Sequence, residues 1–466
     1  MSTFLTNLGN TTSSFSAIEQ AMEVVSSNTT NATTPGYASQ TATLEADPFD
    51  PVHGAIGGVT AGPLVNSRDI YAEMNVQTSQ SAVNFSTTVA NTLQSVVPLF
   101  SLTTSTNTDT SVGATLNALF NSFSSLSVSP NDTATRAGVL SAAGNLASAF
   151  NSTYQSLATT ASNTAAEGQT TVASINSLAA NIQQINAQTL QSGGAGPDPG
   201  ADAQLYNDLE NLSQLTNITF NQQADGTVSV YLGGQSALVV GTTQYAVTSK
   251  AVTSSSSTQG IQILDSNGND ITKIATGGQL GALIQLSNNT LPSYISKLNM
   301  LAQNVADQIN TQMTSGTDQN GNAGQPLFSY NAAAAAKTLS VTGITASQLA
   351  AASSSSPGGN DNAVALENLQ NATMPSLGGA TFTQYYADLG ANVGTDSSNA
   401  SNSETTQQQL LSQAQSVRSN ISGVSLDQQA TLLTEYENSY DAISKLITVV
   451  NELVQTVIGL IPATPA

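Results

Sequence analysis

Residues 433–461 read LTEYENSYDAISKLITVVNELVQTVIGLI. Apolar side chains recur here at alternating spacings of three and four residues, which gathers them on one seam of a helix. The seam consists of Leu433, Tyr436, Tyr440, Ile443, Ile447, Val450, Val454, Val457 and Ile461. A short isolated helix is marginal in water, whereas burial of one large apolar side chain contributes roughly 1.5–3 kcal/mol. The stretch therefore predicts a helix that packs against another helix, as in a coiled coil.

A similar stripe lies near the other end of the sequence. It consists of Phe4, Leu8, Thr11, Phe15, Ile18, Met22 and Val25. The two stripes can close on each other inside one subunit, or they can pack against neighbouring subunits. Periodicity alone leaves both arrangements open, and both make the stripes an assembly surface.

Composition excludes several classes of function. The 466 residues include eight Lys and Arg against 29 Asp and Glu, for a net charge of −21. Nucleic acids and anionic membranes need clustered basic side chains, which are absent, so neither is expected as a partner. There is no cysteine, which excludes disulfides, thiolate zinc sites and a cysteine nucleophile.

Residues 443–461 are the most apolar stretch of the sequence. Lys445, Asn451, Glu452 and Gln455 interrupt it, so we interpret it as an amphipathic helix and expect no insertion into a membrane. The first residues show no secretory signal pattern. On its own this indicates a cytoplasmic protein, although a low-charge chain without cysteine also suits export.

Periodicity predicts a mainly α fold: an elongated helical bundle with terminal coiled-coil helices and a small inserted β domain. Helical spacing dominates both flanks, with a helix expected from about Asp69 to Val97 and another capped by Asn131 or Asp132. Strand-like alternation surrounds Asp225-Gly226, a hairpin signal. Proline and glycine at positions 48–58 predict a loop-rich connector.

These patterns divide the chain into four parts. We expect a terminal coiled-coil domain, a helical rod-like domain, a small β domain, and a loop-rich insertion in the outer part of the molecule. Their respective residues are 1–35 with 405–466, 36–215 with 277–315, 216–276, and 316–404.

No constellation of residues indicates an enzyme or a cofactor site. His53 is the single histidine, and an ordinary role in a loop is expected for it. Residues 265–270 and 318–322 resemble calcium loops, but both lack the glutamate that closes an EF-hand loop. The glycine-rich stretch 277–281 lacks the Lys and Ser/Thr of a phosphate-binding loop. We expect no catalytic residue, no metal and no cofactor.

One stretch resembles a family signature. Residues 26–40 read SSNTTNATTPGYASQ. They are similar to the S-x-N-I-A-N-x-x-T-x-G-Y signature that follows the first helix of bacterial flagellar rod, hook and hook-associated proteins, with Thr29 and Thr30 replacing the usual Ile and Ala. Residues 58–69 resemble the family's next block, and residues 422–427 resemble its closing signature.

Four internal stretches are similar to the hook-associated members in particular. They are residues 130–150, 175–179 with 185–186, 225–234 and 277–283. The resemblance covers nearly the whole chain apart from residues 316–403. It implies a structural subunit that joins the flagellar hook to the filament and lies outside the cell. It also implies export by the flagellar type III apparatus, which needs no cleaved signal peptide.

The same resemblance implies four partners: hook protein, a second hook–filament junction protein, an export chaperone that covers the C-terminal region, and further copies of the chain in a ring. Two alternatives stay open. The chain could be another flagellar axial protein, such as hook protein or the second junction protein. It could instead be an extracellular adhesin, which would not need the terminal helices.

Overall fold

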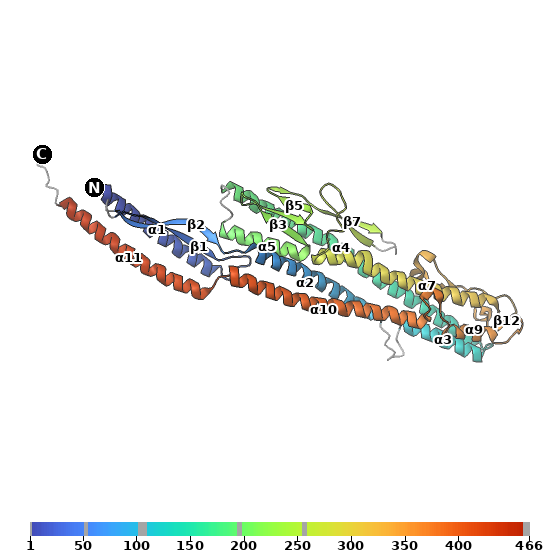
Figure 1. The fold of residues 1–466 in the computed structure, drawn as a ribbon. Helices are drawn as coiled ribbons and strands as arrows, with labels where there is room; N and C mark the ends of the chain where they lie inside the picture. Colours follow the sequence, from blue (N-terminus) through green and yellow to red (C-terminus); the bar gives the residue numbers. More distant parts are fainter. Residues whose placement is uncertain (1, 51–54, 101–109, 193–197, 254–258, 460–466) are drawn as a thin grey trace.

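The structure, a computed structural model, describes residues 2–50, 55–100, 110–192, 198–253 and 259–459. Figure 1 shows an elongated molecule in which both ends of the chain lie at one pole. Helix α9 (Asp361–Asn368) and strand β12 (Ala352–Ser353) lie at the opposite pole. The predicted fold class, an elongated and mainly helical bundle with a small β part, is confirmed.

The terminal part contains two helices and a hairpin. Helix α1 (Ser2–Thr30) lies beside α11 (Leu426–Gly459), and both contribute to the same pole. Strands β1 (Gln40–Asp50) and β2 (Ala55–Asn66) form an antiparallel pair that packs on α1. The pairing register shifts between Ala42 and Leu44.

The loop-rich connector expected at positions 48–58 is wrong for the described residues, because strands occupy most of it. A two-stranded hairpin has only edge strands, and an edge strand tolerates a proline because one of its sides needs no ladder hydrogen bonds. Pro48 therefore fits inside β1, and Gly57 takes a φ of 72° inside β2. His53 lies outside the described residues.

The rod is built mainly from long helices, and the segments with strands are inserted between α4 and α6 and between α7 and α10. It contains α2 (Ile70–Val96), the 3-10 turn η1 (Val97–Phe100), α3 (Val112–Val128), α4 (Thr133–Gln191), α6 (Gly278–Gln285), the π turn η2 (Leu286–Thr290), α7 (Leu291–Ser315) and α10 (Phe382–Ser422). The predicted start near Asp69 is confirmed, since its carboxylate accepts from the Ala72 amide at 2.7 Å. Asp132 caps α4 in the same way through the Thr135 amide, at 2.9 Å.

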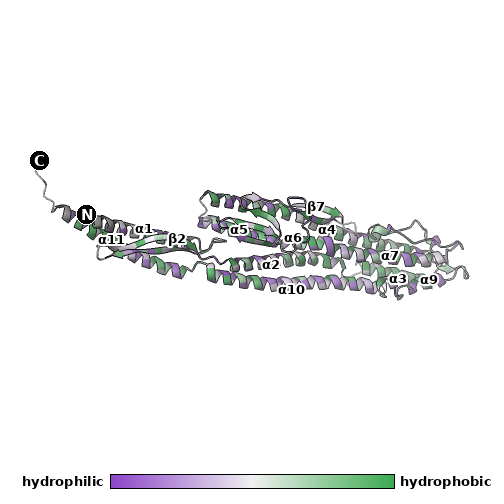
Figure 2. Ribbon diagram, turned by 45° about the horizontal axis from the view of Figure 1, so that its top comes forward, coloured by the Kyte–Doolittle hydropathy of each residue, from purple (hydrophilic) through white to green (hydrophobic). Residues whose placement is uncertain are grey.

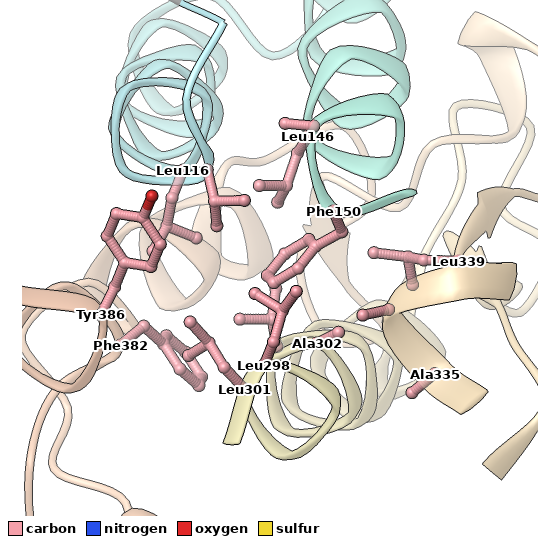
Figure 3. Close-up of a cluster of buried hydrophobic side chains, with 14 of the residues drawn as sticks. Leu116, Leu146, Phe150, Leu298, Leu301, Ala302, Ala335, Leu339, Phe382 and Tyr386 are labelled. Carbon is pink, nitrogen blue, oxygen red and sulfur yellow. The ribbon is translucent and has the colours of Figure 1, made fainter. Parts of the chain in front are cut away.

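A large apolar core lies in the part of the rod that contains α3 and α7. Figure 3 shows side chains of α3, α4, α7 and α10 that point toward one another, together with Leu339 from a neighbouring loop. The rings of Phe120 and Phe382 stack with their centroids 6.2 Å apart. Residues that sequence places far apart therefore share one core, which holds these helices as a single unit.

Strands occur in the middle of the chain, as expected. Strands β3 (Ile218–Gln222), β4 (Val228–Leu232), β5 (Ser236–Val240) and β6 (Thr243–Gln244) form one antiparallel sheet, and β7 (Thr248–Thr253) pairs with β8 (Gln259–Leu264). The hairpin predicted at Asp225-Gly226 is confirmed by the β3–β4 pairing. The strands pack with α4 and α5 (Pro199–Leu215) around a second apolar cluster.

Residues 316–404 differ from the expected loop-rich insertion. Short elements occupy the first part: β9 (Gly316–Thr317), β10 (Phe328–Ser329), η3 (Ala332–Ala334), α8 (Ala335–Thr338), β11 (Ser340–Val341), η4 (Ala346–Gln348), β12, α9 and η5 (Pro375–Leu377). From Phe382 onward the segment is the first half of α10. Its buried face combines Phe382, Tyr386, Leu389 and Val393 at helical spacing with the small side chains of Ser397 and Ala400. The sequence analysis missed this stripe because the Gly, Ser and Asn residues of the segment are also typical of loops.

Figure 2 shows hydrophobic and hydrophilic residues interspersed along α10 and α11. Among the described residues, none of the helices is both long and apolar enough to cross a membrane. Within the same ranges, no group of three or more histidine or acidic side chains is arranged to hold a metal ion.

Candidate assembly interface

The two predicted stripes face each other within one chain. The rings of Phe15 and Tyr440 meet with their centroids 4.6 Å apart, and Val450 is buried on α11. On α1, Ile18 and Val25 are buried. Leu8, Phe15, Met22, Tyr436, Tyr440, Ile443, Ile447 and Val454 are half-buried. The pairing of α1 with α11 thus covers the stripes only in part.

Several predicted residues fall outside this seam. Leu433 is exposed near the start of α11. The helices include Phe4 and Val457, but the structure does not describe their side chains, and Ile461 lies outside the described residues. These three positions stay predictions.

Helix α1 has a second buried face that the sequence analysis missed. Ser14, Ala17, Ala21, Val24 and Asn28 are buried on it. Ser14 Oγ accepts a hydrogen bond from the Val59 amide of β2 at 2.8 Å, so this face packs on the hairpin. Its members follow the same alternation of three and four residues, but they are small or polar. A search limited to large apolar residues could not detect it.

Helix α11 also carries an uncovered apolar stripe. Leu446, Val449 and Leu453 keep 43%, 51% and 53% of their surface exposed, and they follow helical spacing. On α10, Leu410, Val417 and Ile421 are exposed in a similar row. Exposed apolar rows of this kind mark surfaces that contact another molecule.

The signature residues 26–40 tie the parts of the terminal region together. The Asn28 side chain is only 1% exposed and makes four hydrogen bonds. Its Nδ2 donates to the Gln40 carbonyl at 2.8 Å and to Gln429 Oε1 of α11 at 3.1 Å. Its Oδ1 accepts from the Gln40 amide and from the Tyr37 hydroxyl, both at 2.9 Å. One amide therefore joins the end of α1, the start of β1 and the start of α11.

Gly36 of the same segment has a conformational reason to be glycine. Its φ is 75°, which side-chain-bearing residues rarely adopt, and a Cβ there would lie 2.2 Å from the Ala203 carbonyl oxygen of α5. The signature turn can therefore approach α5 only because Gly36 lacks a side chain.

The closing signature, residues 422–427, connects the end of α10 to the terminal part through Ser422. The Ser422 carbonyl accepts from the Ser39 amide at 2.9 Å and from the Ser67 hydroxyl at 3.3 Å. The Asp69 amide donates to the Ser422 hydroxyl at 3.2 Å. The end of α10 is thus fixed to both chain segments that flank the hairpin.

Comparison with known proteins finds family profiles that match two parts of this chain, one in the helical rod and one at the C-terminal end. A family profile described as "Flagellar hook-associated protein FlgK helical domain" matches residues 102–328, and one described as "Flagellar basal body rod FlgEFG protein C-terminal" matches residues 415–460. The chain belongs to the flagellar hook-associated protein 1 (FlgK) family.

Relatives of the FlgK family match along almost their full length. The flagellar hook-associated protein 1 of Bacillus subtilis (strain 168) is 25% identical over 493 residues, covering 95% of this chain and 96% of the relative. That of Salmonella typhimurium is 23% identical and covers 96% and 98% of the two chains.

A solved structure has the same fold. The flagellar hook junction protein FlgK from Burkholderia pseudomallei has a TM-score of 0.67 and 16% identity, with 75% of this chain and all of that chain covered. The FlgK relatives are structural flagellar proteins and not enzymes, so this chain is a structural component of the flagellum.

Proposed function

We propose that this chain is a hook–filament junction subunit that polymerises through its terminal helices after type III export. The observation that carries the proposal is the uncovered stripe of Leu446, Val449 and Leu453 beside a seam already occupied by α1. Full burial of one large apolar side chain contributes roughly 1.5–3 kcal/mol, so covering this stripe with a neighbouring helix favours assembly.

The terminal pairs of several subunits would line the inner wall of a tube, and the rods would form the next shell. In the ring, the chain would present one face to hook protein and the other to the second junction protein. Before assembly, an export chaperone would cover the C-terminal helix, because the stripe is apolar and exposed in the single subunit. The protein would lie outside the cell, at the junction.

The seam and the uncovered stripe of α11 can each be tested by adding negative charge. Ile447→Asp, Val450→Asp and Val454→Asp together place unpaired carboxylates in the seam. Leu446→Asp, Val449→Asp and Leu453→Asp together place them on the uncovered stripe. The matched control is Thr448→Asp, Asn451→Asp and Gln455→Asp, which adds the same charge to exposed polar positions of α11.

We expect both apolar triple variants to be lost from flagella and the control to be incorporated and motile. The measurement is immunogold electron microscopy of intact flagella with an antibody against this chain, together with motility. A narrow band at the distal end of the hook supports the junction role. Label along the whole hook or filament would assign the chain to another axial role, and normal motility of the stripe variant would contradict assembly through α11.

Deletion of residues 426–466 separates the junction role from the adhesin alternative. Removal of α11 takes away both the seam and the stripe, so axial assembly should fail. An adhesin would keep its binding because it does not need the terminal helices. Retained adhesion by the truncated protein would therefore favour the alternative.

A further inference from the structure

A cavity in the rod is lined by α2, by α10 and by the chain segments at the start of β3 and of α6. Helix α2 supplies one wall, α10 contributes Ser403 and Gln407, and residues 217–218 and 276–277 complete the lining. Its volume is about 360 Å³, and small-molecule sites range over about 300–1,000 Å³. The cavity is therefore large enough for a small ligand.

The lining of this cavity is uncharged. Hydroxyl and carboxamide groups supply its polar atoms, and the half-buried Phe85 supplies an aromatic ring. An ion that left water for this cavity would find no side chain of opposite charge, which is unfavourable. The lining therefore favours a neutral ligand that can form hydrogen bonds.

A buried donor at the cavity lacks a partner. Gln77 of α2 lines the cavity and is only 4% exposed. Its Nε2 makes no hydrogen bond with any residue that the structure describes. An unpaired buried donor is costly, and the last bond of a glutamine side chain rotates easily. An acceptor atom placed in the cavity would therefore form a hydrogen bond that the surrounding protein does not supply.

Other parts of the lining are held by their own hydrogen bonds. Asn217 Oδ1 accepts from the Thr276 amide at 3.0 Å and from the Gly277 amide at 3.2 Å. The hydroxyls of Ser86 on α2 and Ser403 on α10 are hydrogen-bonded at 3.0 Å. These walls are fixed before a ligand arrives, which lowers the cost of ordering them on binding.

A second cavity adjoins the first. Its volume is about 380 Å³, and it shares Phe85, Ser86 and Ser403 with the first cavity. Asn399 of α10 and Gln285 of α6 also line it. A ligand made of linked units therefore has room to continue past the Phe85 ring.

We propose that the cavity beside Gln77 binds a neutral sugar, either free or as one unit of a polysaccharide. Sugar hydroxyls both donate and accept hydrogen bonds, which matches a lining of hydroxyls and carboxamides. The face of an aromatic ring such as Phe85 carries partial negative charge and packs against the C–H groups of a sugar ring. A sugar oxygen would accept from Gln77 Nε2. The site does not depend on assembly through the terminal helices.

A peptide matches this lining less well than a sugar. Extended peptides bind by adding a strand to the edge of a sheet, where backbone groups are free to pair. Among the lining residues of this cavity, only Ile218 belongs to a strand. The polar groups here are mainly side chains of helices, which suits a ligand with hydroxyl groups.

Saturation-transfer difference NMR on the purified full chain tests the proposal. The probes are glucose, galactose, mannose and N-acetylglucosamine, with maltotriose and cellotriose as neutral chains. Galacturonic acid is the charged counterpart, and a Gly-Ser-Gly tripeptide with blocked ends represents a peptide. We expect transfer to at least one neutral sugar and weaker transfer to galacturonic acid. Stronger transfer to a trisaccharide than to glucose would indicate a polysaccharide as the source, and equal transfer a free sugar.

Gln77→Leu tests whether the bound sugar occupies this cavity. The substitution removes the unpaired donor and keeps a side chain of similar size. We expect the Kd of the sugar that binds to rise about tenfold, as for one lost hydrogen bond. The midpoint of thermal unfolding should stay the same or rise, because leucine leaves no buried donor unpaired. The matched control is Gln408→Leu, at an exposed position of α10 outside this lining, and it should leave the Kd unchanged.

Three results would overturn the proposal. They are no transfer to any neutral sugar, stronger transfer to the tripeptide than to the sugars, and an unchanged Kd in folded Gln77→Leu. If Gln77→Leu does not fold, Gln407→Leu decides instead, because Gln407 is half-buried and lines the same cavity from α10. Weaker sugar binding by Gln407→Leu supports the site, and unchanged binding rejects it.

Discussion

The terminal helix pair and the outer rod are both built from long helices, yet they are buried to different degrees. In the rod, Leu116, Phe123 and Phe150 are completely shielded from solvent by helices of the same chain. In the terminal pair, most of the predicted seam is half-buried, and a further apolar stripe on α11 is uncovered. The rod therefore contains the partners it needs, whereas the terminal pair leaves apolar surface for another molecule.

The largest expected effect is in the rod core. Phe150→Ala should lower the free energy of unfolding by about 3–5 kcal/mol, because it removes a fully buried ring and leaves a cavity. Urea unfolding followed by circular dichroism measures the change. Val128→Ala at the exposed end of α3 is the control and should change stability by less than about 0.5 kcal/mol. Equal effects of the two substitutions would contradict a self-contained rod core.

An intermediate effect is expected at the signature. Asn28→Ala should cost about 1–3 kcal/mol of local stability, because the buried Gln40 amide and carbonyl lose their partner. Hydrogen–deuterium exchange of α1 and β1 measures the loss, and the rod amides should stay protected. Asn28→Asp keeps the acceptor for the Gln40 amide but replaces the donor with an oxygen that faces the Gln40 carbonyl and Gln429 Oε1, so exchange should rise in β1 and at the start of α11. Protection unchanged in both variants would show that the signature does not tie α1 to α11.

A smaller effect is expected in the seam itself. Phe15→Leu keeps an apolar side chain and removes the ring contact with Tyr440, a pair worth roughly 0.5–1.5 kcal/mol beyond area burial. In the single subunit, exchange in α1 should rise modestly. Loss of stability as large as that of Phe150→Ala would mean that the terminal pair is packed as tightly as the rod, which would remove the contrast between the two regions.

The smallest effect concerns a helix cap in the rod. Hydrogen bonds from the Thr135 amide and hydroxyl hold the pKa of Asp132 below its ordinary value of 3.8. The cap therefore stabilises α4 above pH 3.8, and this contribution is lost as the pH falls through the lower folded pKa. Carboxyl chemical shifts followed by NMR should show the depressed pKa. In Asp132→Asn the first turn of α4 should stay capped without this pH dependence, and an unshifted pKa would contradict the cap.

The two regions also differ in how far the sequence predicted them. The helical stripes at residues 4–25 and 433–461 were predicted because large apolar residues at helical spacing are an unambiguous pattern. The β1–β2 hairpin was missed because Pro48 and the glycines near it also suit loops. The first half of α10 was missed although Phe382, Tyr386, Leu389 and Val393 are buried at helical spacing, because the segment was interpreted from its Gly, Ser and Asn content. A Cβ on Gly390 would lie 3.0 Å from the Phe100 carbonyl oxygen, so close packing there needs glycine.

The sequence alone determined the helical class, a helix start near Asp69, a second start capped by Asn131 or Asp132, the Asp225-Gly226 hairpin and the family signature, since each depends on residues close together in the chain. Only the tertiary structure decided that Asn28 contacts Gln429 and that Arg68, Asp202 and Arg418 form one cluster. It also decided which side of α11 is covered by α1 and which is left exposed. These contacts join residues more than one hundred positions apart, and local periodicity carries no information about which distant surfaces meet.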